Sequence, residues 1–144
     1  MSSREPGPDT RARNSAMRLL ARREHSRAEL RGKLVGRGFE NDSVEELLQG
    51  LEDQDLLSDE RFAMSLIASR AETGYGPKRI DLELRNRGVS EELAREALAK
   101  AEVDWGQQVT DQAVRKFGSD PAQTFPEWAR RARYLERRGF RLNF

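Results

Sequence analysis

The chain has 144 residues, and 73 of them, about 51%, are Ala, Glu, Lys, Leu or Arg, whereas Ile, Val and Thr together supply only 12. This composition favours helices and argues against a sheet-based fold. The formal net charge is only +1, no cysteine is present, and His25 is the single histidine. Disulfides, thiolate zinc sites and cysteine nucleophiles are therefore excluded, and histidine-based catalysis has almost nothing to work with.

Residues 1–14 begin the chain with a polar segment that contains Pro6, Gly7 and Pro8 and no hydrophobic signal core. We expect this segment to be a flexible leader. No apolar run approaches the ~18 residues of a membrane span. These observations predict a cytoplasmic protein that makes no contact with a membrane.

Residues 15–57 are predicted to form a first repeat of three helices. The first helix carries an apolar stripe made of Ala16, Leu19 and Leu20. Ser26 with Glu29 indicates a capping box at the start of the second helix, and Asp42 with Glu45 indicates another at the start of the third. Two predicted repeats follow, at residues 58–102 and 103–144.

The second and third repeats carry start signals of their own. Pro77 suits the first position of a helix, and Ser90 and Thr124 suit helix N-caps. In the third repeat, Trp128, Ala132 and Leu135 form an apolar stripe at helical spacing. Only four residues follow Phe140, so we expect this repeat to lack its last helix.

A three-residue motif marks the end of one helix in each repeat. The motif occurs as Arg37-Gly38-Phe39, Arg87-Gly88-Val89 and Arg138-Gly139-Phe140, at intervals of 50 and 51 residues. Its glycine suits a left-handed C-cap, and the apolar residue after it suits the contact that accompanies such a cap. The pattern predicts an all-α protein in which tandem three-helix repeats form an elongated, solenoid-like array.

Basic side chains recur on one face of a predicted helix in every repeat, and we take them as candidate binding residues for a protein partner or nucleic acid. These residues are Arg27 and Arg31 in the first repeat, Lys78 and Arg85 in the second, and Arg130, Arg133 and Arg137 in the third. The last three project within a ~60° sector opposite the apolar stripe. Tyr75, between two glycines, is the aromatic residue that we expect to be exposed.

The middle repeat resembles the RecX family, regulators of the bacterial recombinase RecA. The runs that carry the resemblance are Leu56-Leu57-Ser58-Asp59-Glu60-Arg61-Phe62-Ala63, Gly74-Tyr75-Gly76-Pro77-Lys78-Arg79-Ile80 and Glu83-Leu84. The first repeat is similar to that family through Leu19-Leu20-Ala21-Arg22-Arg23-Glu24-His25-Ser26 and Glu29-Leu30. The resemblance covers roughly residues 14–140.

The resemblance implies a noncatalytic, monomeric protein that binds RecA, both as the free monomer and as a filament on single-stranded DNA. It implies inhibition of filament growth, ATP hydrolysis, strand exchange and coprotease activity, and hence a role in recombination, DNA repair and the SOS response. Single-stranded DNA would be reached through the filament. No cofactor and no metal are expected.

Two other functions are consistent with the sequence. A stand-alone helical protein that binds nucleic acid would use the same basic faces without a protein partner. An adaptor unrelated to recombination would dock through the acidic segment 40–60 or through the open apolar face of the third repeat.

Overall fold

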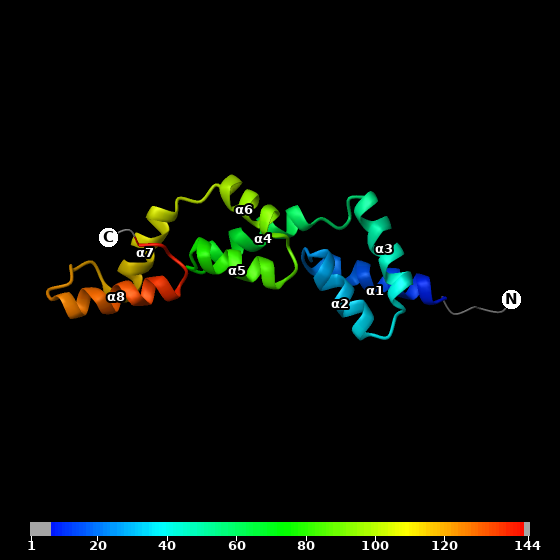
Figure 1. The fold of residues 1–144 in the computed structure, drawn as a ribbon, viewed down its shortest axis with the longest axis horizontal. Helices are drawn as coiled ribbons and strands as arrows, with labels where there is room; N and C mark the ends of the chain where they lie inside the picture. The colour runs from blue at the N-terminus through cyan, green and yellow to red at the C-terminus, as the bar shows by residue number, and fades with distance from the viewer. Residues whose placement is uncertain (1–6, 143–144) are drawn as a thin grey trace. The chain divides into compact units, whose positions relative to one another are not determined.

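The structure of the chain, a computed structural model, describes residues 7–142. This part of the chain contains eight helices and no strand, as the composition predicts (Figure 1). In chain order the helices are α1 (Pro8–Arg22), α2 (Arg27–Gly36), α3 (Asn41–Asp53), α4 (Asp59–Glu72), α5 (Pro77–Asn86), α6 (Glu91–Lys100), α7 (Trp105–Phe117) and α8 (Phe125–Arg137). Among these eight, none has both the length and the apolar character that spanning a bilayer would require.

The first helix begins earlier than the sequence suggests. Pro8 is the first residue of α1, and Asp9 lies in the first turn, where a negative charge is favourable. Ala12 and Ala16 are buried, so packing against the rest of the unit also stabilises the first half of α1. The prediction of a flexible leader is therefore wrong for residues 8–14, and its first six residues lie outside the described part.

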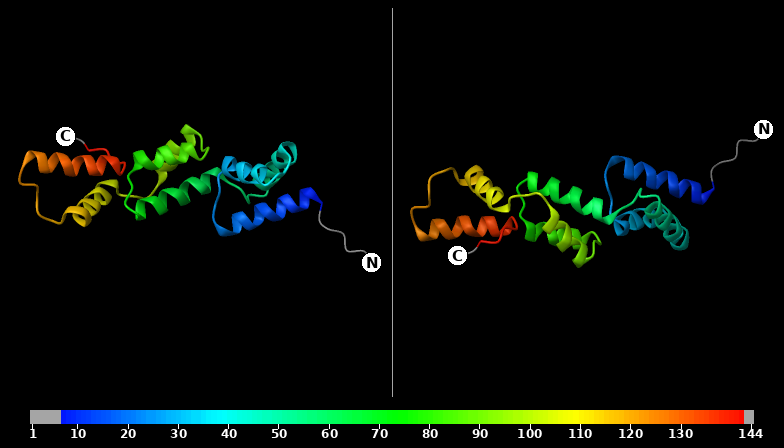
Figure 2. Two further views of the ribbon diagram at one scale, coloured as in Figure 1. Left: turned by 90° about the horizontal axis from the view of Figure 1, so that it is seen from below. Right: turned by 90° about the horizontal axis from the view of Figure 1, so that it is seen from above.

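The described chain packs as two compact units. Unit 1 comprises the residues through Ala63 together with Arg87–Val89, and unit 2 comprises Met64–Asn86 and the residues from Ser90 onward. In unit 2, α5 packs on α6 and α7 packs on α8. In unit 1, helices α1, α2 and α3 pack on one another and lie together in both views of Figure 2.

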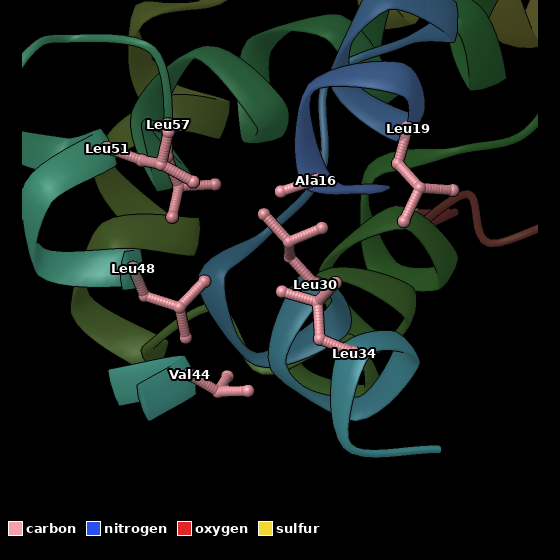
Figure 3. Close-up of a cluster of buried hydrophobic side chains, with 8 residues drawn as sticks. All are labelled: Ala16, Leu19, Leu30, Leu34, Val44, Leu48, Leu51 and Leu57. Atoms are coloured by element: carbon pink, nitrogen blue, oxygen red, sulfur yellow. The ribbon is translucent and has the colours of Figure 1, made fainter. Parts of the chain in front are cut away.

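The core of unit 1 is a cluster of buried aliphatic side chains, most of them leucines, contributed by all three helices and the segment after α3 (Figure 3). Leu30 and Leu34 face it from α2, and Val44 and Leu48 face it from α3. Each of these four side chains is fully buried. Burial of a leucine side chain stabilises a fold by ~2 kcal/mol, so this cluster is the main support of the unit.

The repeated Arg-Gly motif ends helices as the sequence predicts. Gly38, Gly88 and Gly139 have φ angles of +93°, +90° and +99°. These angles lie in the left-handed region, which glycine adopts without the strain that a Cβ atom brings. The C-cap interpretation of the motif is therefore confirmed at all three positions.

A polar cluster at the start of α2 joins this helix to Arg87, which also belongs to unit 1. Ser26 and Glu29 form the predicted capping box, and the Ser26 hydroxyl also donates a hydrogen bond to the carbonyl of Arg87. Glu29 accepts hydrogen bonds from Arg23 and, at 2.8 Å, from Arg87. Burial alone would raise the pKa of Glu29, but the hydrogen bonds and charge of Arg23, with the charge of Arg87, lower that pKa to about 2.

A side chain at Gly88 would destabilise the fold in two ways, through the positive φ angle and through overlap with α2, and these two effects can be measured separately. A Cβ atom at Gly88 would overlap the Ala28 side chain, whereas a Cβ atom at Gly38 would meet nothing within 4 Å. Both Gly→Ala variants should lose ~1 kcal/mol because of the positive φ angle, and Gly88→Ala should lose ~1–3 kcal/mol more through overpacking. Urea denaturation measures the difference, and equal losses would show that the contact with Ala28 does not contribute.

The acid stability of unit 1 should depend on Glu29. Its folded pKa of about 2 lies below the ordinary value of 4.5, so its stabilisation is present above the unfolded pKa and is lost as the pH falls through the folded pKa. The difference corresponds to ~3 kcal/mol. Glu29→Gln should therefore lower the free energy of unfolding at pH 7 and much less near pH 2.5. A difference between the two proteins that stays constant across this pH range would contradict the ion-pair explanation.

Candidate partner and nucleic-acid interface

The predicted basic residues of the first repeat are engaged within unit 1. Arg27 pairs with Glu45 at 3.1 Å and with Glu52 at 2.9 Å, and Arg31 pairs with Glu45 as well. Burial alone would lower the pKa of Arg27, but the hydrogen bonds to Glu52 and Glu45 raise it. These two arginines therefore join α2 to α3, and a partner could reach them only by displacing the carboxylates.

The same network explains why one predicted capping box is wrong. Helix α3 begins at Asn41 with Glu40 as its N-cap, and no side chain caps it. Glu45 does not fold back toward Asp42, because hydrogen bonds from Arg31 and Arg27 hold it and lower its pKa. Two charge-assisted partners outweigh one neutral backbone donor.

Helices α7 and α8 form the scaffold of the candidate surface in unit 2. Asp104 caps α7 by accepting a hydrogen bond from the amide of Gln107, and Thr124 caps α8 by accepting one from the amide of Glu127. Pro126 follows in the first turn of α8. The predicted start of this helix is confirmed.

Polar and aromatic contacts hold these two helices together. Gln112, which is buried, donates a hydrogen bond to the Tyr134 hydroxyl at 3.1 Å. Phe117 meets the edge of the Tyr134 ring with a centroid distance of 5.4 Å. Ala132 and Leu135 are buried, but Trp128 is 43% exposed. The prediction of an apolar stripe on α8 is thus confirmed for Ala132 and Leu135, whereas Trp128 is only partly covered and lies at the edge of the core.

Opposite the buried side of α8, the helix presents three exposed arginines, Arg130, Arg133 and Arg137. They share a ~60° sector at ~100° per residue, and this sector contains no acidic residue. Within residues 7–142, no ion pair or hydrogen bond engages any of these three guanidinium groups. Their positive charge is available to an external partner, in contrast to that of Arg27 and Arg31.

Two close backbone contacts bring the start of α5 to the end of α8, where the red segment passes α5 in Figure 1. The amide of Gly76 donates a hydrogen bond to the Arg138 carbonyl at 2.7 Å, and the amide of Lys78 donates one to the Gly139 carbonyl at 3.0 Å. A Cβ atom at Gly76 would overlap the backbone of Gly139. The glycine therefore permits the approach of two chain segments, a role that the sequence does not reveal.

Tyr75 lies between two guanidinium groups at this junction. The guanidinium carbon of Arg79 is 4.3 Å from the ring centroid, and that of Arg138 is 4.1 Å from it. Arg138 also donates hydrogen bonds to the carbonyls of Thr73 and Gly74. Tyr75 is consequently half-buried, and the expectation that it is simply exposed is wrong.

The junction places exposed cations of α5 next to those of α8. Arg79 donates a hydrogen bond to the carbonyl of Arg137 at 3.4 Å, and Lys78 is exposed beside Gly139. We define the basic face as Arg130, Arg133 and Arg137 together with Lys78 and Arg79. Arg85 is not part of it, because it lies two turns farther along α5 and pairs with Asp81 at 3.0 Å.

Sequence reasoning missed Arg79, which lies on another sector of α5 than Lys78. Only the backbone contact with the end of α8 brings it into the basic face. In an Arg-rich chain nothing distinguishes Arg79 from the other arginines. The glycines on both sides of Tyr75 indicate an unusual backbone, but they do not reveal the contact with α8. Within residues 7–142, no group of His, Asp and Glu side chains is suited to hold a metal ion.

Comparison with known proteins finds RecX proteins, both by family model and by sequence identity. Residues 12–51 match the model of the first three-helix domain of RecX, and residues 58–98 match that of the second. The regulatory protein RecX of Cronobacter sakazakii is 43% identical over 141 residues, which cover 91% of this chain and 86% of the relative. The regulatory protein RecX of Halorhodospira halophila is 45% identical over 128 residues, covering 89% of this chain and 80% of the relative.

Solved structures show the same fold. The crystal structure of RecX from Lactobacillus salivarius superposes with a TM-score of 0.75 at 24% identity and covers 93% of this chain and 89% of its own. A second crystal structure of a regulatory protein RecX superposes with a TM-score of 0.77 at 20% identity, covering 98% of this chain and 76% of its own.

The two groups of arginines should differ in their effect on stability. Replacing Arg130, Arg133 and Arg137 with Gln should change the free energy of unfolding by less than ~0.5 kcal/mol, because these side chains are exposed and without ion pairs in the described structure. Arg27→Gln should cost ~1–2 kcal/mol because two carboxylates lose their partner. Urea denaturation of both variants tests this, and a large loss in the triple variant would assign the α8 arginines a structural role.

Proposed function

The chain belongs to the RecX family of regulatory proteins, and we propose on this basis that it binds the recombinase RecA, both as a monomer and as a filament on single-stranded DNA. Binding restrains filament growth, ATP hydrolysis, strand exchange and coprotease activity. The protein acts as a monomer in the cytoplasm, without a cofactor and without a reaction of its own. The observation that supports a binding role most directly is the basic face of unit 2.

The basic face suits an anionic partner. Its arginines can each bind two oxygens of a carboxylate or phosphate, and no carboxylate of the described chain competes for Arg130, Arg133 or Arg137. An acidic surface of the recombinase or the phosphates of the DNA strand inside a filament would both fit. We assign the primary contact to this face and not to Arg27 and Arg31, because Arg27 is held by two carboxylates, those of Glu45 and Glu52, and Arg31 shares Glu45 with it. A partner would have to displace all of these contacts together.

Arg85 has an ion pair, unlike the α8 arginines of the basic face, but this pair is easier to break than those of Arg27. Its ion pair with Asp81 joins neighbouring turns of one helix, and its side chain is 45% exposed. Exposed pairs of this kind contribute only a few tenths of a kcal/mol. Arg85 can therefore turn to a partner at little cost, and we place it at the edge of the interface, two turns along α5 from Lys78.

A second candidate function is direct nucleic-acid binding without a recombinase, which the same basic face favours. The two functions predict different effects of excess DNA. A nucleic-acid binder would affect the recombinase only by competing for DNA, so raising the DNA concentration would remove its effect. A regulator that binds the recombinase would keep its effect when DNA is in excess.

The proposed activity can be measured as RecA-dependent ATP hydrolysis on single-stranded DNA during titration with this protein. We expect hydrolysis to fall toward a low plateau. Changing Arg130, Arg133 and Arg137 to Glu should raise the concentration for half inhibition by about tenfold or more, because each lost contact with a charged group is worth ~1 kcal/mol and each new charge repels.

The matched control reverses three exposed arginines scattered over α1, α6 and α7, namely Arg18, Arg95 and Arg115. It changes the net charge by the same amount, so it should inhibit nearly as well as the unaltered protein. Equal losses in both triple variants would show that overall charge governs binding. If saturating protein left hydrolysis unchanged, the proposed function would be wrong.

A further inference from the structure

The start of α8 exposes two aromatic rings outside the core of unit 2. Phe125 is 75% exposed and Trp128 is 43% exposed. Their rings stack with a centroid distance of 5.8 Å and an interplanar angle of 24°. The pair is thus held nearly parallel, and Trp128 supports one side of Phe125 while most of the Phe125 ring remains in contact with solvent.

The aromatic pair is continuous with the basic face. Residues four apart form a row along a helix, and the row that begins at Phe125 continues through Ala129 to Arg133 and Arg137. Phe125 and Arg133 are separated by about 12 Å along the helix axis. The acidic residue nearest to Phe125 on the helix, Glu127, is paired with Arg131 at 2.7 Å, so its charge is compensated. The other acidic residue of α8, Glu136, is exposed and forms no ion pair with Arg133 or Arg137 in the described chain.

This arrangement fits single-stranded nucleic acid better than an apolar peptide. Proteins that bind single strands combine aromatic rings, which stack on bases, with cations that contact the phosphates. An apolar helix would need apolar surface beyond the ring pair, but the row passes from a small alanine directly to guanidinium groups. The planar ring and the adjacent positive charge are therefore complementary to a base and its backbone.

We propose that Phe125, supported by Trp128, is a stacking platform for one base of single-stranded DNA, whose phosphates contact Arg133 and Arg137. This inference rests on the proposed function and chooses, of the two anionic partners that fit the basic face, the phosphates of a DNA strand. It names the part of the chain that recognises bases. Recognition by stacking is independent of base identity, because every base has a flat face.

The test uses the protein alone, without recombinase, and measures binding to a fluorescein-labelled oligothymidine of 12 nucleotides by anisotropy in low salt. Phe125→Leu keeps an apolar side chain but removes the ring, and it should weaken binding by about fivefold or more, since stacking contributes ~1 kcal/mol or more per base. Phe125→Tyr keeps the ring and should bind within about twofold of the unaltered protein. Phe125 is mostly exposed, so both variants should fold, which circular dichroism verifies.

A second ligand separates stacking from attraction to phosphates. An abasic oligomer of the same length has the phosphates but no bases, so Phe125→Leu should bind it as well as the unaltered protein does. Equal weakening on both oligomers, or no weakening on oligothymidine, would overturn the platform. Failure of the unaltered protein to bind oligothymidine would overturn the platform too. If Phe125 and Trp128 instead contacted a protein partner, Phe125→Leu would impair RecA inhibition but not DNA binding, and this result would also overturn the platform.

These outcomes remain distinguishable from a failure of the proposed function, because inhibition of RecA-dependent ATP hydrolysis is measured separately on the same variants. Inhibition without DNA binding would leave the regulator intact and remove the platform. DNA binding with a loss specific to Phe125→Leu, but without any inhibition, would support the platform and contradict the regulator.

Discussion

The close approach of two backbone segments at Gly76 and Gly139 is the constraint on which the candidate interface depends. The hydrogen bonds between residues 76–78 and 138–139 can form only because neither glycine carries a side chain at the contact. This contact places Lys78 and Arg79 beside the last turn of α8. The glycines therefore determine which cations become neighbours, although they bear no charge themselves.

Arginines that look alike in the sequence have two different environments in the structure. Those of α2 face the acidic helix α3 and pair with Glu45 and Glu52, and these ion pairs join the two helices. Those of α8 lie opposite the side that packs on α7, and no acidic residue shares their sector. Charge that is already compensated by a neighbour contributes little to recognition, because a partner would have to replace an existing ion pair.

Local features of the fold could be predicted from the sequence, and features that depend on distant residues could not. The capping box of Ser26 and Glu29, the cap at Thr124 and the Arg-Gly stops each involve residues within one or two turns. By contrast, the partner of Glu45 lies on another helix, and the environment of Tyr75 includes Arg138. The exposure of Trp128 also escaped prediction, because helical spacing does not tell how far along α8 the core extends.

The junction between α5 and α8 also bears on the order of folding. Arg138 and Thr73, which share a hydrogen bond there, are 65 residues apart in sequence, whereas the α7–α8 pair joins helices that follow one another in the chain. Closing a long loop costs conformational entropy before its contacts can offset the loss, so we expect the junction to assemble after the local helix pairs. We therefore expect the α8 arginines to be in place before Lys78 and Arg79 join them, so that the basic face forms only once these distant segments of the chain have met.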